Sequence, residues 1–158
     1  MKLQEAQQIS KEVTESLSPY CERIEIAGSI RRRQPTVHDI DIVLIEKPEA
    51  VLLINGALAS IGMIKLSGNK IKRLQYHKAN IGIDLYFATP ATWSTLLLIR
   101  TGSKENNIRL ATQAKRRGWH LSASGDGLFN GKGERVAGDS EQSIYEALGL
   151  PYQEPQDR

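Results

Sequence analysis

The chain has 158 residues, enough for one ordinary domain or for a small domain with an attached lobe. Its apolar fraction of 40% and charged fraction of 25% are close to globular averages, so it can bury a core. The formal net charge of +3 permits a polyanionic partner without requiring one.

Cys21 is the only cysteine, which excludes an intramolecular disulfide and favours a reducing compartment. No secretory leader opens the chain, and no apolar run reaches the length of a membrane span. We therefore expect a soluble, intracellular protein that does not bind membranes.

The first half of the chain alternates between helical and strand patterns. Apolar residues at helical spacing predict an amphipathic helix over 2–18. The segment RIEIAG alternates as a strand, and residues 40–45 return as a second strand after a turn. Residues 49–61 are typical of a helix, and 63–87 of three further strands.

The second half predicts a smaller lobe of helices and a hairpin. Thr89 is a good N-cap for a helix that ends near residue 100, and Ser103 for the next helix. A hairpin is expected around 130–131, followed by a last helix capped by Asp139. The boundary between the two parts is expected between residues 89 and 90, and Trp93 is expected to pack at their junction.

Two aspartates stand one residue apart in AGSIRRRQPTVHDIDIVLIEK, at the start of an otherwise apolar strand. Residues i and i+2 of a strand share a face, so Asp39 and Asp41 lie together. Asp84 in IGIDLYF joins them if its strand lies alongside with the same orientation. Three carboxylates suit Mg²⁺. An isolated D-x-D pair, by contrast, is more often an exposed pair on an edge strand.

The residues before this strand have the character of an anion site. Gly28 and Ser29 form a turn that offers backbone N–H groups and a hydroxyl. Arg31, Arg32 and Arg33 follow, and arginine binds phosphate oxygens bidentately. One or two of the three arginines are expected to be simply solvated.

The Gly-Ser turn, the DID triplet and the later IDLYF resemble the signature of the DNA polymerase beta-like nucleotidyltransferases. The stretch from IRTGSKENN to GLPYQEP resembles the C-terminal subdomain of X-family DNA polymerases. The resemblance implies an α+β fold: a nucleotidyltransferase palm with a mixed sheet flanked by helices over 1–89, and a small helical and hairpin thumb over 90–158. The family's N-terminal lyase and helix-hairpin-helix domains are not expected in this chain.

The resemblance also implies roles for individual residues. Asp39 and Asp41 would bind two Mg²⁺ ions, with Mn²⁺ as an alternative. Asp84 would bind the catalytic metal and help to deprotonate a primer 3′-hydroxyl. Ser29 and Arg32 would hold the triphosphate. The full set expected to contact the nucleotide is Gly28, Ser29, Arg32, Arg100, Thr101, Gly102, Ser103 and Asn107.

The chain departs from the family where an aromatic pair often precedes T-G-S. Ile99 and Arg100 occupy those positions, so the discrimination between ribo- and deoxyribonucleotides is left open.

Two basic segments are the expected DNA contacts. Residues 65–78 carry five basic residues and no acid, and residues 100–117 carry six basic residues and one acid. An ordinary solvated helix face is the competing interpretation for any single lysine. The expected DNA contacts are Lys70, Lys72, Arg73, Lys104, Arg109, Lys115 and Arg116.

These patterns favour a DNA-directed DNA polymerase that fills short gaps, with DNA and dNTPs as partners and a monomeric state. Two alternatives are kept. The first is a nucleotidyltransferase with another acceptor, or one that adds nucleotides without a template. The second is an inactive DNA-binding module.

Overall fold

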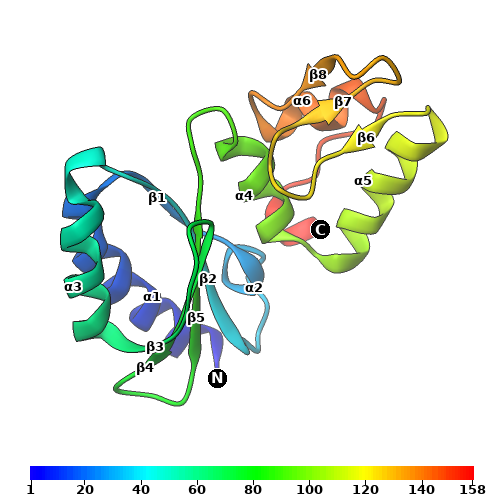
Figure 1. Cartoon of the computed structure of the whole chain (residues 1–158). Helices are drawn as coiled ribbons and strands as arrows, with labels where there is room; N and C mark the ends of the chain where they lie inside the picture. Colours follow the sequence, from blue (N-terminus) through cyan, green and yellow to red (C-terminus); the bar gives the residue numbers. More distant parts are fainter.

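The computed structural model describes residues 1–158 and shows two lobes joined at their sides (Figure 1). The N-terminal lobe contains a five-stranded mixed sheet of order β1-β2-β5-β4-β3, in which only β2 and β5 are parallel. Its elements are α1 (Leu3–Leu17), η1 (Ser18–Tyr20), β1 (Cys21–Ile26), α2 (Gly28–Arg31), β2 (Asp39–Glu46), η2 (Pro48–Ala50), α3 (Val51–Ile61), β3 (Gly62–Ser67), β4 (Ile71–Tyr76) and β5 (Gly82–Phe87).

Helices α1 and α3 cover one face of this sheet, and the other face is turned toward the second lobe (Figure 1). Successive side chains of β2 point to opposite faces of the sheet, which explains why the two faces differ. Ile40, Ile42 and Leu44 are fully buried against the helices, whereas the residues between them point to the opposite face. Burying each such side chain contributes roughly 1.5–3 kcal/mol. The predicted amphipathic helix is confirmed, because the apolar residues of α1 form its buried stripe.

The C-terminal lobe has its own small core around Leu98, Leu110, Leu128, Ile144 and Tyr145. A three-stranded sheet of order β6-β7-β8 packs with three helices. The elements are α4 (Trp93–Thr101), α5 (Lys104–Arg116), β6 (His120–Leu121), β7 (Leu128–Phe129), β8 (Arg135–Ala137), α6 (Glu141–Ala147) and η3 (Pro155–Asp157).

A third apolar cluster joins the lobes. Trp93, Leu96 and Leu97 of α4 pack against Val43 of β2 and Tyr86 of β5. This confirms the predicted place of Trp93 at the junction. The face of the sheet that carries the acidic residues is therefore partly closed by α4.

Two helix starts differ from the sequence prediction. Thr89 does not cap a helix that begins at Pro90; it exchanges hydrogen bonds with Thr92, and α4 begins at Trp93. The last helix is capped by Ser140 rather than Asp139, because Ser140 forms a reciprocal capping box with Ser143. The Asp139 carboxylate instead accepts a hydrogen bond from Arg135.

The single cysteine, Cys21, is buried, and burial raises the pKa of its thiol to about 11. None of the helices combines the length and apolar character that crossing a bilayer requires. Several apolar side chains of α3 and β3 are exposed.

Candidate active site

Strand register brings two of the predicted acids face to face. In the parallel pairing of β2 with β5, Asp41 lies opposite Asp84 and Asp39 lies opposite Gly82. Because paired residues of adjacent strands point to the same face, all three carboxylates lie on the face turned toward the C-terminal lobe. Asp39 is exposed, Asp41 is half-buried and Asp84 is buried.

Asp41 is crowded by the backbone of a turn, by a tyrosine hydroxyl and by two other carboxylates. A Cβ atom at Gly28 would collide with its carboxylate, and Gly28 has φ +58°, so the Gly-Ser turn approaches the acid with bare backbone. The Tyr86 hydroxyl lies 3.4 Å from Asp41 Oδ1. Burial, followed by the charges of Asp84 and Asp39, raises the pKa of Asp41 to about 6.

Asp84 is bound by an arginine that the sequence did not connect to it. Arg73 lies opposite Asp84 in the antiparallel pairing of β4 with β5. Its Nε and Nη2 donate to the two carboxylate oxygens over 2.6 and 2.7 Å, a bidentate pair. This contact raises the pKa of the Arg73 guanidinium.

The three carboxylates therefore share a face but are not assembled as a ligand set, and no group of three or more His, Cys, Asp or Glu side chains is placed to hold a metal. The residue types nevertheless fit a divalent cation. Hard carboxylate oxygens are the ligands Mg²⁺ prefers. Burial and the charges of Asp84 and Asp39 raise the pKa of Asp41, and a bound cation would oppose both effects.

The other half of the site is the turn between α4 and α5. Thr101 is fully buried, and its backbone oxygen accepts a hydrogen bond from Arg32 while its hydroxyl accepts one from Arg31 over 2.8 Å. Gly102 has φ +72°, a conformation that favours glycine. Ser103 then caps α5 through its hydroxyl, which accepts from the Asn106 backbone at 3.2 Å.

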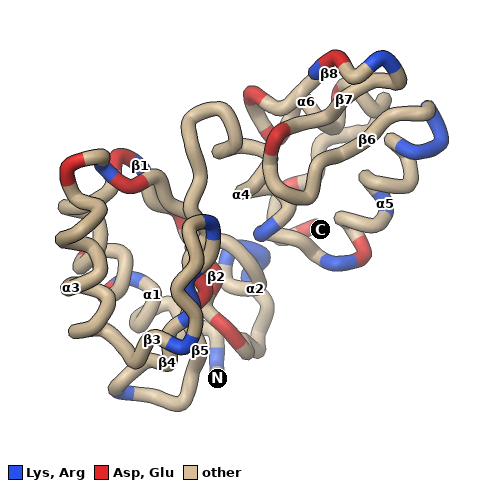
Figure 2. Tube along the Cα trace, in the orientation of Figure 1, with Lys and Arg blue, Asp and Glu red and all other residues tan.

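The two halves enclose a cleft of about 460 Å³ between the lobes. Figure 2 shows that acidic β2 and basic α2 lie near one another at this junction. All the residues predicted to contact the nucleotide line the cleft except Ser103, and Asp84 does not line it. The lining residues are Gly28, Ser29, Arg32, His38, Asp39, Asp41, Ile99, Arg100, Thr101, Gly102, Lys104, Asn107 and Ile108.

Several polar atoms around the cleft have no partner. The Nε atoms of Arg32 and Arg100 and the Oδ1 atom of Asn107 are buried without a hydrogen bond. The Arg100 guanidinium stacks on Tyr86 at 4.3 Å from the ring centroid. Asn107 donates its amide to the Ile99 backbone oxygen over 2.8 Å. Buried unpartnered groups of this kind cost about 1–3 kcal/mol each, and a polar ligand in the cleft would provide partners for them.

The predicted DNA contacts are dispersed. Lys104 lines the cleft, but Lys72 donates to Asn55 and Ser67 within the N-terminal lobe. Arg109 donates to Asn106 and Gln153 within the C-terminal lobe. Lys115 and Arg116 are exposed and lie at the end of α5 farthest from the cleft. Figure 2 shows this end of the helix in the blue of basic residues.

An ion-pair network behind the cleft was not foreseen from the sequence. Arg31 of α2 donates to both carboxylate oxygens of Glu141 in α6 over 2.8 Å. Arg158, whose side chain is fully buried, donates to the same carboxylate over 2.9 Å. Although burial opposes it, the bonds and charges of Arg31 and then Arg158 hold the pKa of Glu141 below its ordinary value.

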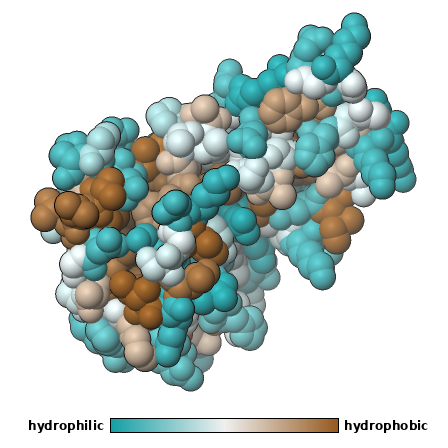
Figure 3. All heavy atoms as spheres, viewed as in Figure 1, coloured by the Kyte–Doolittle hydropathy of each residue, from teal (hydrophilic) through white to brown (hydrophobic).

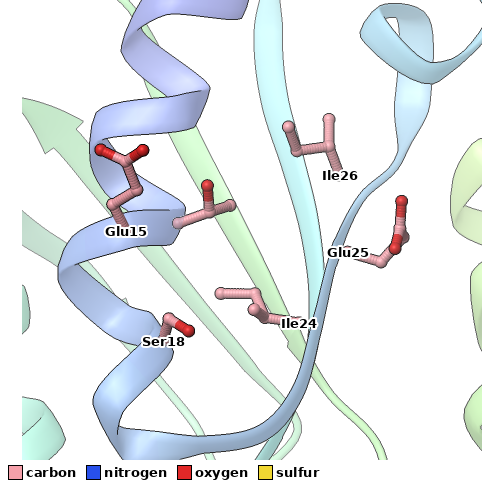
Figure 4. A pocket seen from close by; sticks show the side chains of 6 residues that line it. Glu15, Ser18, Ile24, Glu25 and Ile26 are labelled. Atoms are coloured by element: carbon pink, nitrogen blue, oxygen red, sulfur yellow. The ribbon is translucent and has the colours of Figure 1, made fainter.

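A separate hollow of about 250 Å³ lies between α1 and β1, away from these residues. Figure 4 shows that Ile24 and Ile26 point toward α1, whereas Glu25 points to the opposite side of β1. None of the predicted site residues lines it.

A mixed sheet with acids on adjoining parallel strands is thus closed by a helical lobe across a cleft. Residues 96–158 match the family model described as DNA polymerase beta thumb. The crystal structure of Leishmania infantum polymerase beta in a ternary P/T complex superposes with a TM-score of 0.82. That match has 22% identity and covers 100% of this chain and 76% of the other, so it establishes the fold.

The chain is also 32% identical over 157 residues to the DNA polymerase/3′-5′ exonuclease PolX of Bacillus subtilis. The alignment covers 97% of this chain and 27% of the relative, so the chain spans about a quarter of that protein's length. The chain is thus similar to part of PolX and, over residues 96–158, to the DNA polymerase beta thumb, and it has the fold of polymerase beta.

Proposed function

We propose that this chain transfers a nucleotidyl group from a deoxynucleoside triphosphate to the 3′-hydroxyl of a DNA primer, and that it fills short gaps in DNA. The observation that carries the proposal is the cleft, where Asp39 and Asp41, the Arg32 side chain and the turn after Thr101 come together. The relationship to PolX supports DNA as the substrate class. Residues 1–89 would form the catalytic palm and 90–158 the thumb.

The two sides of the cleft would bind different parts of the nucleotide. Ser29, at the N-terminus of the short helix α2, and Arg32 would bind the triphosphate, since the Arg32 Nε has no partner within the protein. Gly102 would let the backbone approach the sugar, and Asn107 would present its unpartnered Oδ1 toward the base. Arg32 is anchored on Thr101, so the phosphate side and the sugar side are held in one geometry.

Asp39, Asp41 and Asp84 would hold two Mg²⁺ ions, or Mn²⁺, which when bound supply positive charge to the phosphates and to the attacking oxygen. In this structure Asp84 is bound to Arg73. Arg73 therefore stabilises the carboxylate in the absence of a cation, as well as being a predicted DNA contact.

The test is extension of a 5′-labelled primer across a one-nucleotide gap with Mg²⁺, offering each dNTP and rNTP separately. We expect addition of the complementary dNTP only, and its loss in the double variant Asp39→Ala, Asp41→Ala. Asp139→Ala is the matched control, because the Asp139 side chain is 92% exposed and lies outside the cleft. Equal extension by the double variant would refute the proposal.

One observation favours a second candidate, a nucleotidyltransferase that uses ribonucleotides or another acceptor. Arg100 lines the cleft with a buried, unpartnered Nε where family members often have an aromatic residue. An arginine donor can hydrogen-bond to a ribose hydroxyl. Addition of rNTPs in the same assay, or addition without a template, would select this candidate.

A further inference from the structure

The sheet of the palm ends in an apolar surface at β3. Six of the eight exposed large apolar residues of the chain lie on α3 and β3, and Figure 3 shows brown surface over α3 and further brown toward the β3–β4 hairpin. Monomeric proteins rarely expose large contiguous apolar patches without a function. The residues are Val51, Leu52, Leu53, Met63, Ile64 and Leu66; together with Lys65 we name them the β3 edge surface.

The backbone of β3 is open on one side. β3 is the last strand of the sheet and pairs only with β4. Outside the sheet, no backbone hydrogen bond reaches residues 63–67. The outer N–H and C=O groups of β3 are therefore available to pair with another strand.

Both faces of this open strand are apolar. Ile64 lies opposite Leu74, which is buried in the core beneath α1 and α3, so Ile64 is on the helix side. Leu66 lies opposite Arg73, which is on the side of the catalytic acids. Ile64 is 38% exposed and Leu66 47%. Successive residues of an added strand would point to opposite faces of the sheet, and on each face they would meet an apolar side chain of β3.

The stretch of sequence that contains β3 and β4 carries charge of a single sign. No acidic residue occurs between Glu49 and Asp84. Lys65 lies at an irregularity in the pairing of β3, and its ammonium group forms no ion pair and only one hydrogen bond, to the Met63 sulfur at 3.8 Å. The Lys70 side chain makes no hydrogen bond or ion pair, unlike Lys72. A partner at this edge would therefore gain from carrying carboxylates.

We propose that the β3 edge surface binds an extended segment of another protein, which carries both apolar and acidic residues on each of its two faces, as a sixth strand of the palm sheet. A second copy of this chain fits less well, because pairing of two β3 strands brings the Lys65 side chains together. DNA would leave the apolar side chains and the open backbone without complementary groups. The irregularity and Lys65 also discourage self-pairing, which is a known use of charged residues on edge strands.

The test uses a fluorescent ten-residue peptide in which pairs of valines alternate with pairs of glutamates, titrated into the full chain. We expect saturable binding, together with slowed hydrogen exchange of the backbone amides of residues 63–67. A peptide with lysine in place of each glutamate should bind about tenfold more weakly or not at all. Lys65→Glu should reverse this preference.

Val136→Ser is the matched control, since Val136 is 39% exposed on the thumb and should leave binding unchanged. Leu66→Ser should weaken it. The proposal is overturned if residues 63–67 show no protection, if the two peptides bind equally, or if Lys65→Glu has no effect. Protection of 63–67 in the free protein that grows with its concentration would assign the surface to a second copy. Protection of residues 63–67 by anionic lipid vesicles or by duplex DNA, but not by the peptide, would also overturn the proposal.

Discussion

Arg31 and Arg32 are neighbours in the chain, yet they serve the junction between the lobes in opposite ways. Behind the cleft, Arg31 is fully engaged by Thr101 and by both oxygens of Glu141, and its side chain is only 19% exposed. Inside the cleft, Arg32 holds the Thr101 backbone but keeps a buried Nε without a partner. Arg31 holds the two lobes together, whereas Arg32 keeps a donor that a ligand in the cleft could use.

The difference shows that a run of like charges in a sequence is not one functional unit. The short helix α2 points successive side chains in different directions, so each arginine meets a different environment. Variants of the cleft are therefore expected to change chemistry and binding, whereas variants behind it are expected to change stability.

The largest effect is expected in the cleft, at Asp41. Asp41→Asn should lower kcat/KM for primer extension by about 10³-fold, or about 4 kcal/mol, because the amide removes a charge from the proposed cation site. Thermal unfolding should shift little or upward, since a half-buried carboxylate near two others is lost. Asp139→Asn serves as control. Activity within tenfold of the parent would contradict the role of Asp41.

Behind the cleft, Arg31→Ala should lower the free energy of unfolding by about 3 kcal/mol, because Glu141 remains buried with only Arg158 as its partner. The midpoint of thermal unfolding should fall by roughly 6–10 °C. Chemical denaturation measures this directly. Arg33→Ala is the comparison, since the Arg33 side chain is exposed. Equal stability of the two variants would show that the network contributes nothing.

Arg32→Lys should separate the two arginines. Lysine keeps the charge but cannot reproduce the planar fork, so the dissociation constant for a dNTP should rise about tenfold, or about 1.4 kcal/mol. Titration calorimetry gives this constant without turnover. The proposed phosphate contact is wrong if the variant binds the nucleotide as the parent does.

The smallest effect is on the pH dependence of stability. The folded pKa of Glu141 lies below its ordinary value of 4.5, so its stabilisation is present above pH 4.5 and is lost as the pH falls through the lower folded value. Denaturation of the parent chain and of Glu141→Gln should therefore converge below pH 4.5. A constant difference between them down to pH 3 would argue against this linkage.

The carboxylates and the Gly-Ser turn could be predicted because they rest on local rules. The period of a strand places Asp39 and Asp41 on one face, and a turn beside them brings backbone N–H groups. The partner of Asp84 could not be predicted, because Arg73 reaches it only through the pairing of β4 with β5. The pair of Arg31 and Glu141 spans 110 residues and depends on how the lobes pack.

The exact first residue of a helix also could not be predicted, although it depends on residues close together in the sequence. Asp139 and Ser140 are both good N-caps, and the choice is made by Ser143, which completes the capping box with Ser140. The pattern of 63–67 was correctly assigned to a strand, but its place at the end of the sheet came only from the order of strands. The exposure of its apolar residues could therefore not be foreseen.

Thr101 is fully buried and accepts hydrogen bonds from both arginines. Arg31 donates to its hydroxyl and Arg32 to its backbone oxygen. A swing of the thumb that preserves these two bonds must pivot at this residue. Helix α5 starts three positions later and extends 13 residues, a lever of roughly 20 Å. A pivot of about 10° would carry its far end, with Lys115 and Arg116, through roughly 3–4 Å, while Gly102 barely moves. Thr101 would act as a pivot that lets the far end of α5 move while the lining of the proposed nucleotide site keeps its shape.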